Sequence, residues 1–293
     1  MYNKPLEYLL KPDPKDVLSP IGIKLRQAIN PIFRAIAPFT GQVKFKILEK
    51  AELPKNVPLI FAPTHGFKDD TLLTVTTIGV NAYIFMGSLP QMFHTFDGYT
   101  AWLNGMILVD RSNKESRRTG KEKMIYAINN GANILMFPEG VWNKSPNLLL
   151  LKLFPGIYDV AKETGAWIVP IGTHIEDGIA YSIMDAAFDI AKYDREEGMA
   201  VLRDKLATLK WDLTERFSVT TRDELLSGMA PDDYWNDFLE KLIATADFYD
   251  YEVENNAEYK DKRITSNEQA FEHLKSIKLN STNAFLFNKS HIG

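Results

Sequence analysis

Cysteine is absent from the sequence. This excludes disulfide bridges, cysteine nucleophiles and metal sites built on thiolates, and it is typical of a reducing compartment. Long hydrophobic runs are missing too: no stretch reaches the roughly 18 uncharged apolar residues of a membrane-spanning helix, and the N-terminus lacks the apolar centre of a signal peptide. We therefore expect a cytoplasmic protein whose association with a membrane, if it has one, is peripheral.

Neither sign of charge dominates the chain. It has 34 lysine and arginine residues and 38 aspartate and glutamate residues, for a formal net charge of −4. This balance argues against a general nucleic-acid-binding protein. The 45% of hydrophobic and 25% of charged residues over 293 positions are ordinary for a globular protein with one large domain and additions.

The N-terminal segment, residues 1–40, contains one amphipathic stretch. Between Ile21 and Phe39, apolar residues recur at three- and four-residue steps, which predicts a helix. These residues are Ile21, Leu25, Ile29, Ile32, Phe33 and Ile36. Pro31 lies inside the pattern and is expected to kink or break the helix. Two roles fit such a stretch: a helix that lies on a membrane, or a helix that packs on its own domain.

Short apolar runs alternate with helical stretches from residue 41 to residue 197. The predicted strands are Val43–Ile47, Pro58–Ala62, Ala82–Met86, Met106–Val109, Asn133–Phe137 and Trp167–Ile171. The predicted helices between them are Thr71–Thr77, Lys114–Asn129 and Ile157–Thr164. This alternation predicts an α/β domain with a central sheet flanked by helices. Residues 198–293 are predicted to form a helix-rich C-terminal extension, with helices over Met199–Arg216 and Pro231–Tyr249.

One of only five histidines, His65, stands in the stretch HGFKDD, directly after a predicted strand. Histidine is the natural general base near neutral pH, and a carboxylate on its second ring nitrogen fixes its tautomer. Pro63 and Gly66 argue against a helix interior at this point, so we expect a turn, with a helix beginning near residues 68–70. From a turn, either Asp69 or Asp70 can reach the imidazole.

Three further stretches contain predicted strands; the first ends in an acid and a base, the second has a carboxylate at its tip, and the third is a strand with a proline. They are Gly105–Arg111, Phe137–Gly140 and Trp167–Gly172. Strand ends and the loops beyond them are where α/β proteins usually assemble their sites. These stretches therefore join His65 as candidates for one common site.

The blocks HGFKDD, GMILVDR, FPEG, LFPGI and VPIG, in this order and spacing, resemble the glycerolipid acyltransferase family. This family includes the 1-acylglycerol-3-phosphate and related lysophospholipid acyltransferases, and the resemblance covers about Val43 to His174. It implies transfer of a fatty acyl group from a thioester of coenzyme A or acyl carrier protein to a lipid hydroxyl, at a membrane surface. No further cofactor and no metal are implied.

The resemblance also implies roles for individual residues. His65 matches the catalytic histidine and Asp70 its carboxylate partner. The residues that match the acceptor site are Arg111, Glu139 and Gly140, and Lys144 follows them as a further candidate. A guanidinium suits a phosphate head group because it offers two parallel hydrogen bonds.

Each acceptor-site candidate has a structural alternative. Arg111 can form an ion pair with Asp110 or Glu139, and Glu139 can accept hydrogen bonds from the backbone. Lys144 and Lys152 can simply be solvated.

The sequence departs from the family pattern after the third block. Many members continue with Thr-Arg, whereas this chain has Val141 and Trp142. Without that arginine, a different lysophospholipid, or an acceptor without a phosphomonoester, is favoured over lysophosphatidic acid. The fourth block, with Phe154-Pro155-Gly156, also differs from the commoner lysine-glycine pairing.

Two other functions compete with acyl transfer. The first is a protein that binds acyl lipids or an acyl carrier but has kept only the fold, and the presence of both His65 and Asp70 speaks against it. The second is a metal-dependent hydrolase with His65, Asp69 and Glu139 as ligands. The ordered family blocks have no explanation under the second.

Overall fold

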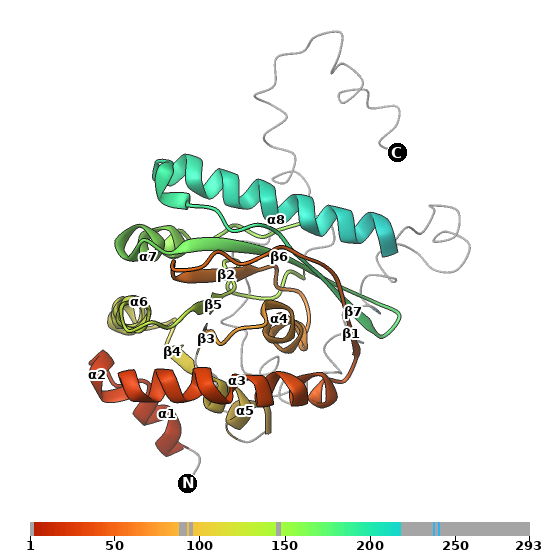
Figure 1. Cartoon of the computed structure of the whole chain (residues 1–293). Coiled ribbons are helices and arrows are strands. Elements are labelled where there is room, and N and C mark those ends of the chain that lie inside the picture. The colour runs from red at the N-terminus through yellow and green to blue at the C-terminus, as the bar shows by residue number, and fades with distance from the viewer. Residues whose placement is uncertain are drawn as a thin grey trace.

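A seven-stranded sheet forms the centre of the protein (Figure 1). The computed structural model describes residues 3–87, 93, 96–144, 148–217, 237 and 240. The strands, in chain order, are β1 (Lys44–Lys50), β2 (Leu59–Pro63), β3 (Tyr83–Gly87), β4 (Met106–Val109), β5 (Ile134–Met136), β6 (Trp167–Glu176) and β7 (Ile179–Met184). Their order across the sheet is β1-β7-β6-β2-β5-β3-β4.

Five neighbouring strands, β6, β2, β5, β3 and β4, run parallel. β7 is antiparallel to β6 and parallel to β1. The carboxyl ends of the five parallel strands therefore meet at one edge of the sheet, where ligand sites of open α/β sheets lie. The predicted α/β fold with a central sheet flanked by helices is confirmed, although the sequence patterns did not identify β7 as a strand.

Helices cover both faces of the sheet. The helices are α1 (Asn3–Leu9), α2 (Pro14–Val17), α3 (Pro20–Thr40), α4 (Asp70–Ile78), α5 (Phe96–Asn104), α6 (Lys114–Asn129), α7 (Gly156–Thr164) and α8 (Arg195–Phe217). Ile60 and Ile134 point to the face covered by α6, α7 and α8, whereas Phe61 and Leu135 point to the face covered by α4 and α5. This alternation along buried strands produces three layers, because successive strand residues point to opposite faces.

Helix α3 lies outside α4 and α5, as the lowest long helix in Figure 1. Of the two effects expected of Pro31, the break does not occur, since the helix runs unbroken from Pro20 to Thr40. Pro31 and Gln27 are both exposed, so the Gln27 carbonyl that loses its helical partner can bond to water.

The apolar stripe of α3 faces outward. The inward contacts come from Ile23, Asn30 and Ala37, which recur every seven residues. The large exposed apolar side chains of the helix are Ile21 (81% exposed), Leu25 (60%), Ile32 (64%), Ile36 (54%) and Phe39 (87%). Within the described part of the chain, the helix thus packs on its own domain while five large apolar side chains of its outer face stay exposed. No helix of the described part of the chain is long and apolar enough to cross a membrane.

Helix α8 begins at Arg195, close to the predicted start of the C-terminal extension at residue 198, and packs along β6. Its leucines Leu202 and Leu206 belong to the main core cluster. The extension therefore starts as part of the α/β domain. The helix predicted over Pro231–Tyr249 lies outside the described residues, and the division into three segments stays a prediction.

Candidate active site

His65 occupies a turn between β2 and α4. Strand β2 ends at Pro63, and α4 begins at Asp70, with Asp69 as its N-cap residue. This agrees with the turn and the helix start expected from the proline and the glycine around the histidine. The turn places His65 at the carboxyl end of a central strand, with 16% of its side chain accessible to solvent.

The partner of the imidazole is Asp70. His65 Nδ1 lies 2.8 Å from Asp70 Oδ2, and the same oxygen accepts hydrogen bonds from the backbone N–H groups of Gly66 (2.9 Å) and Phe67 (3.3 Å). Asp70 is fully buried. With Nδ1–H donating to a carboxylate that the backbone holds in place, the lone pair of the neutral ring resides on Nε2.

The neighbouring Asp69 contacts a different segment. Its side chain makes no cap hydrogen bond to α4, and its Oδ2 accepts from the backbone N–H of Gln42 at 2.6 Å. It thereby fastens the segment between α3 and β1 to the start of α4. Of the two aspartates that the sequence left open, the geometry selects Asp70 for the histidine.

Glu139 supports the backbone of the same turn. One carboxylate oxygen accepts from the N–H of His65 (3.0 Å) and the other from the N–H of Leu151 (2.8 Å). The residue is 1% exposed, and burial raises the pKa of its carboxyl group, against the opposing effect of these hydrogen bonds. This is the backbone-accepting arrangement named above as the alternative for Glu139.

Two aromatic rings flank the imidazole. The ring of Phe137 lies 4.1 Å from that of His65 between centroids, and the ring of Trp142 meets it edge-on at 6.2 Å. The backbone N–H of Asn143 donates to the His65 carbonyl at 2.8 Å. Trp142, at the position where the family resemblance implies an arginine, therefore lines the histidine site. Its position next to the FPEG block was the only sequence signal for this.

The other candidates lie around this centre. Arg111 follows β4, and its guanidinium packs so closely on Gly87, at the end of β3, that a side chain there would collide with it. Gly140 has a φ of +71° and faces the ring of Phe154. Lys144 is half-buried, next to the Asn143 that contacts His65. His65, Asp70 and Glu139 are thus joined by hydrogen bonds, and Arg111 lies at the same edge of the sheet.

Sequence reasoning missed Lys210 of α8. Its Nζ donates to the Thr173 carbonyl at 3.0 Å and lies 3.3 Å from His174 Nδ1. Part of its stem is accessible, but burial of the ammonium group lowers the pKa of Lys210 to about 8, although the carboxylates of Glu139, Asp70 and Glu176 favour the charged form. A signal existed: Lys210 follows Leu206 by four residues and precedes Leu213 by three, in line with two buried leucines.

The pKa of Lys210 has a consequence for stability. Because the pKa falls from 10.5 to about 8 on folding, the unfolded chain binds more protons between these values, and the wild type gains stability as pH rises through this window. We expect the free energy of unfolding of the wild type, measured relative to that of Lys210→Met, to rise by a few kcal/mol from about pH 8 to 10.5. Urea unfolding of both proteins across this range measures the difference, and a constant difference would contradict a buried ammonium group.

The donors of the metal-site alternative do not converge. His65 Nδ1 is bound to Asp70, Asp69 accepts from Gln42, and both oxygens of Glu139 accept backbone hydrogen bonds. Among the described residues, no group of three histidine or acidic side chains is arranged to hold a metal ion. The geometry therefore favours the imidazole as a proton acceptor over the imidazole as a metal ligand.

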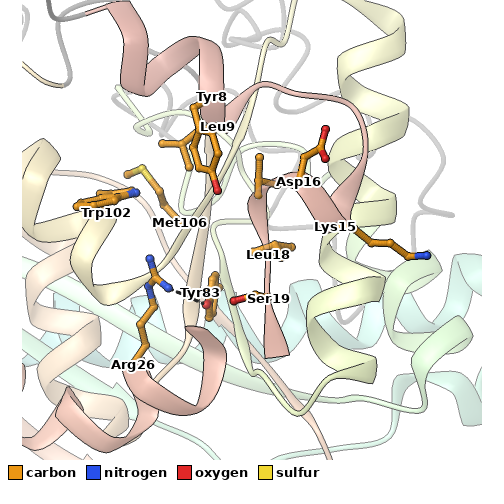
Figure 2. A pocket seen from close by; sticks show the side chains of 11 residues that line it. Tyr8, Leu9, Lys15, Asp16, Leu18, Ser19, Arg26, Tyr83, Trp102 and Met106 are labelled. Carbon is orange, nitrogen blue, oxygen red and sulfur yellow. Dashed lines mark hydrogen bonds between the residues drawn. The ribbon is translucent and has the colours of Figure 1, made fainter. Parts of the chain in front are cut away.

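A cavity of about 200 Å³ lies at the other edge of the sheet (Figure 2). Its lining includes Tyr83 and Met106, the first residues of β3 and β4, whereas His65 follows the last residue of β2. Figure 2 shows Arg26 of α3 reaching the Tyr83 hydroxyl in this cavity, at 3.5 Å. The cavity is therefore separate from the histidine site.

Comparison with known proteins gives consistent matches. Residues 44–174 match the acyltransferase family. The chain is 22% identical over 218 residues to the 1-acyl-sn-glycerol-3-phosphate acyltransferase of Escherichia coli, covering 68% of this chain and 87% of the relative. It is 26% identical over 169 residues to the enzyme of the same name from Haemophilus influenzae, covering 54% and 67%.

A solved structure matches as well. The crystal structure of the 1-acyl-sn-glycerophosphate acyltransferase PlsC from Thermotoga maritima superposes with a TM-score of 0.50 at 16% sequence identity. The match covers 67% of this chain and 84% of that one. At this identity the likeness concerns the fold.

Proposed function

The chain belongs to the glycerolipid acyltransferase family, and from this premise we propose that it transfers a fatty acyl group from a thioester to the hydroxyl of a lysophospholipid. The donor is a thioester of coenzyme A or acyl carrier protein, and His65 and Asp70 carry the catalysis. The observation that carries the proposal is the 2.8 Å hydrogen bond between His65 Nδ1 and the buried Asp70, at the carboxyl edge of the sheet.

The chemistry follows from the orientation of the ring. Nε2 of His65 accepts the proton of the acceptor hydroxyl as its oxygen attacks the thioester carbonyl. The imidazolium that forms is stabilised by Asp70. When the tetrahedral intermediate collapses, the carbon–sulfur bond breaks and the imidazolium returns its proton to the thiolate. The acyl group passes directly to the acceptor, with no acyl-enzyme, and the chain has no cysteine that could form one.

The acceptor is held at the same edge of the sheet. We assign its head group to Arg111 and Lys144, with Gly140 and the Glu139 segment shaping the floor. Trp142 stands beside the imidazole and provides an aromatic surface instead of an arginine. A lysophospholipid with a larger head group, or a lipid without a phosphomonoester, therefore suits the site better than lysophosphatidic acid.

A panel of substrates tests this proposal. The purified protein is given acyl-coenzyme A or acyl carrier protein loaded with the same chain, together with lysophosphatidic acid, lysophosphatidylethanolamine, lysophosphatidylcholine or a monoacylated glycolipid. We expect a diacylated product with at least one pair and a preference for an acceptor other than lysophosphatidic acid. Tight binding of acyl thioesters with no product from any pair would instead favour a binding protein that has only the fold.

The outward apolar stripe of α3 supports attachment to the membrane that holds the acceptor. Replacing Ile32 and Ile36 with serine removes two exposed side chains, each worth about 1.5 kcal/mol or more when fully buried. We expect roughly 10- to 100-fold weaker partitioning into phospholipid vesicles. Vesicle sedimentation measures it.

A matched control is Trp211→Ser on α8, a helix on the far side of the sheet from α3 (Figure 1). Trp211 is 52% exposed, so the control also removes an accessible apolar side chain. Vesicle binding should be unchanged by it. Equal weakening by both changes would show that α3 is not the docking face.

A further inference from the structure

The candidate site buries two carboxylates close to the histidine. Asp70 is 0% and Glu139 1% exposed, and both accept backbone hydrogen bonds that hold the His65 turn. Burying ionised carboxylates is costly unless an opposite charge compensates them. Protonated His65 lowers the pKa of Glu139, but the general base is neutral before the reaction, and Arg111 and Lys144 are assigned to the acceptor head group.

The compensating charge is in α8, outside the region that matches the family. Lys210 is the cation whose charged form is favoured by Glu139, Asp70 and Glu176 together. Its ammonium group also contacts His174, whose pKa is lowered to about 3 by burial and by Lys210. Lys210 is therefore in contact with one neutral imidazole, and the charges of three carboxylates favour its protonated form.

Gly172 explains how α8 packs so closely against β6. A Cβ atom at Gly172 would lie 2.7 Å from Leu209 Cβ and 3.1 Å from the Leu209 carbonyl carbon. Only glycine allows the helix backbone to pack against β6 at this point, and the next helix residue is Lys210. The glycine of the VPIG block thus has a packing function that sets the position of the lysine.

Lys210 is also linked to His65 through the strands. The Thr173 carbonyl accepts from Lys210 and from the Thr64 hydroxyl, and the Thr173 hydroxyl donates to the Thr64 carbonyl at 3.0 Å. Thr64 directly precedes His65. A change in the charge or position of Lys210 therefore reaches the histidine turn through one strand and through Glu139.

We infer that Lys210 is a positioning residue of the active site: its positive charge keeps Glu139 ionised, and ionised Glu139 holds the His65 backbone in the geometry that catalysis needs. The inference rests on the proposed acyl transfer. It assigns a function to the C-terminal helix, because α8 supplies a cation whose charged form is favoured by the buried carboxylates that hold the His65 turn.

Activity against pH tests the inference. Burial raises the pKa of Glu139, and the charge of Lys210 opposes this rise. Without the Lys210 charge, Glu139 should therefore stay protonated up to a higher pH. We expect Lys210→Met to move the acid limb of the kcat/KM profile upward by about one pH unit. Lys210→Arg should keep the limb near its wild-type position. Lys205 lies elsewhere on α8 and forms an ion pair with Asp185, and Lys205→Met should not move the acid limb.

His65, as the general base, also contributes to the acid limb, so a limb that stays in place in Lys210→Met overturns the inference when the midpoint of Glu139 in the titration below is unchanged as well. If the wild-type protein shows no acyl-transfer activity, the proposed function is refuted instead. The electrostatic part is then decided by NMR on protein carrying ¹³C-labelled glutamate carboxyl groups, with Glu139→Gln to assign the signal.

In that titration, the midpoint of Glu139 should rise in Lys210→Met, and an unchanged midpoint would overturn the inference without reference to activity. If the methionine variant does not fold, the wild type suffices. Its Glu139 signal should show a second inflection near pH 8, where Lys210 loses its proton. A Glu139 signal without this second inflection would also overturn the inference.

Discussion

Replacing His65 with alanine is expected to lower kcat for acyl transfer by about 10²- to 10⁴-fold, the range commonly lost with a general base. The acceptor hydroxyl then loses its base, because Asp70, which is hydrogen-bonded to the ring, is buried behind it. KM should change little, since the imidazole acts on the proton being transferred and does not hold the head group. Steady-state kinetics with thiol release as the signal gives both constants.

The fold should survive this change. His65 is partly exposed, and its backbone contacts with Glu139 and Asn143 do not involve the side chain. Circular dichroism and thermal unfolding provide the check. Added imidazole should restore part of the activity, because it can occupy the space left between Phe137 and Trp142. Activity within twofold of wild type, with an intact fold, would end the general-base mechanism.

Asp70→Asn is expected to have the second-largest effect, a loss of about 10²- to 10⁴-fold in kcat. An amide can present an N–H group to His65 Nδ1, and the ring then holds its proton on Nε2, where the lone pair is needed. The change also weakens the acceptor of the Gly66 and Phe67 N–H groups, at a cost of about 1–3 kcal/mol in stability. Kinetics and urea unfolding should be measured on the same preparation.

Asp69→Asn is the matched control for this variant. The two aspartates are adjacent and both buried, but Asp69 accepts from Gln42, which an asparagine oxygen can still do. Its activity should stay near wild type. In the double variant His65→Ala/Asp70→Asn, the loss should be close to that of the single histidine variant, because the two residues act as one unit. Additive losses, or equal losses from both aspartate variants, would argue against the assigned pair.

Local patterns in the sequence were sufficient to predict much of the sheet and the surroundings of His65. Strand β4 and helix α6 have the predicted bounds, because apolar runs and helical periodicity reflect burial directly. The turn at His65 follows from Pro63 and Gly66. The choice between Asp69 and Asp70 did not follow from spacing, because a turn, unlike a helix, does not determine which neighbouring side chain points back.

The features that depend on distant contacts could not be predicted. The parallel pairing of β7 with β1 is one of them, although β7 itself carries a local signal, because it follows β6 through the two-residue turn Asp177-Gly178. The periodicity of α3 predicted a helix with one apolar face, but not that this face points away from the domain. Lys210 is separated from Glu139 by some seventy residues along the chain, and only the packing of α8 on Gly172 brings it to the site.

The most direct test of the account is the stoichiometry of a single assay. Wild-type protein is incubated with an acyl thioester and a lysophospholipid in vesicles, and free thiol and diacylated lipid are quantified together by mass spectrometry. We predict one lipid product for each thiol released, and thiol release that depends on the acceptor. Thiol released without lipid product would indicate hydrolysis, and would contradict direct acyl transfer from the thioester to an acceptor deprotonated by His65.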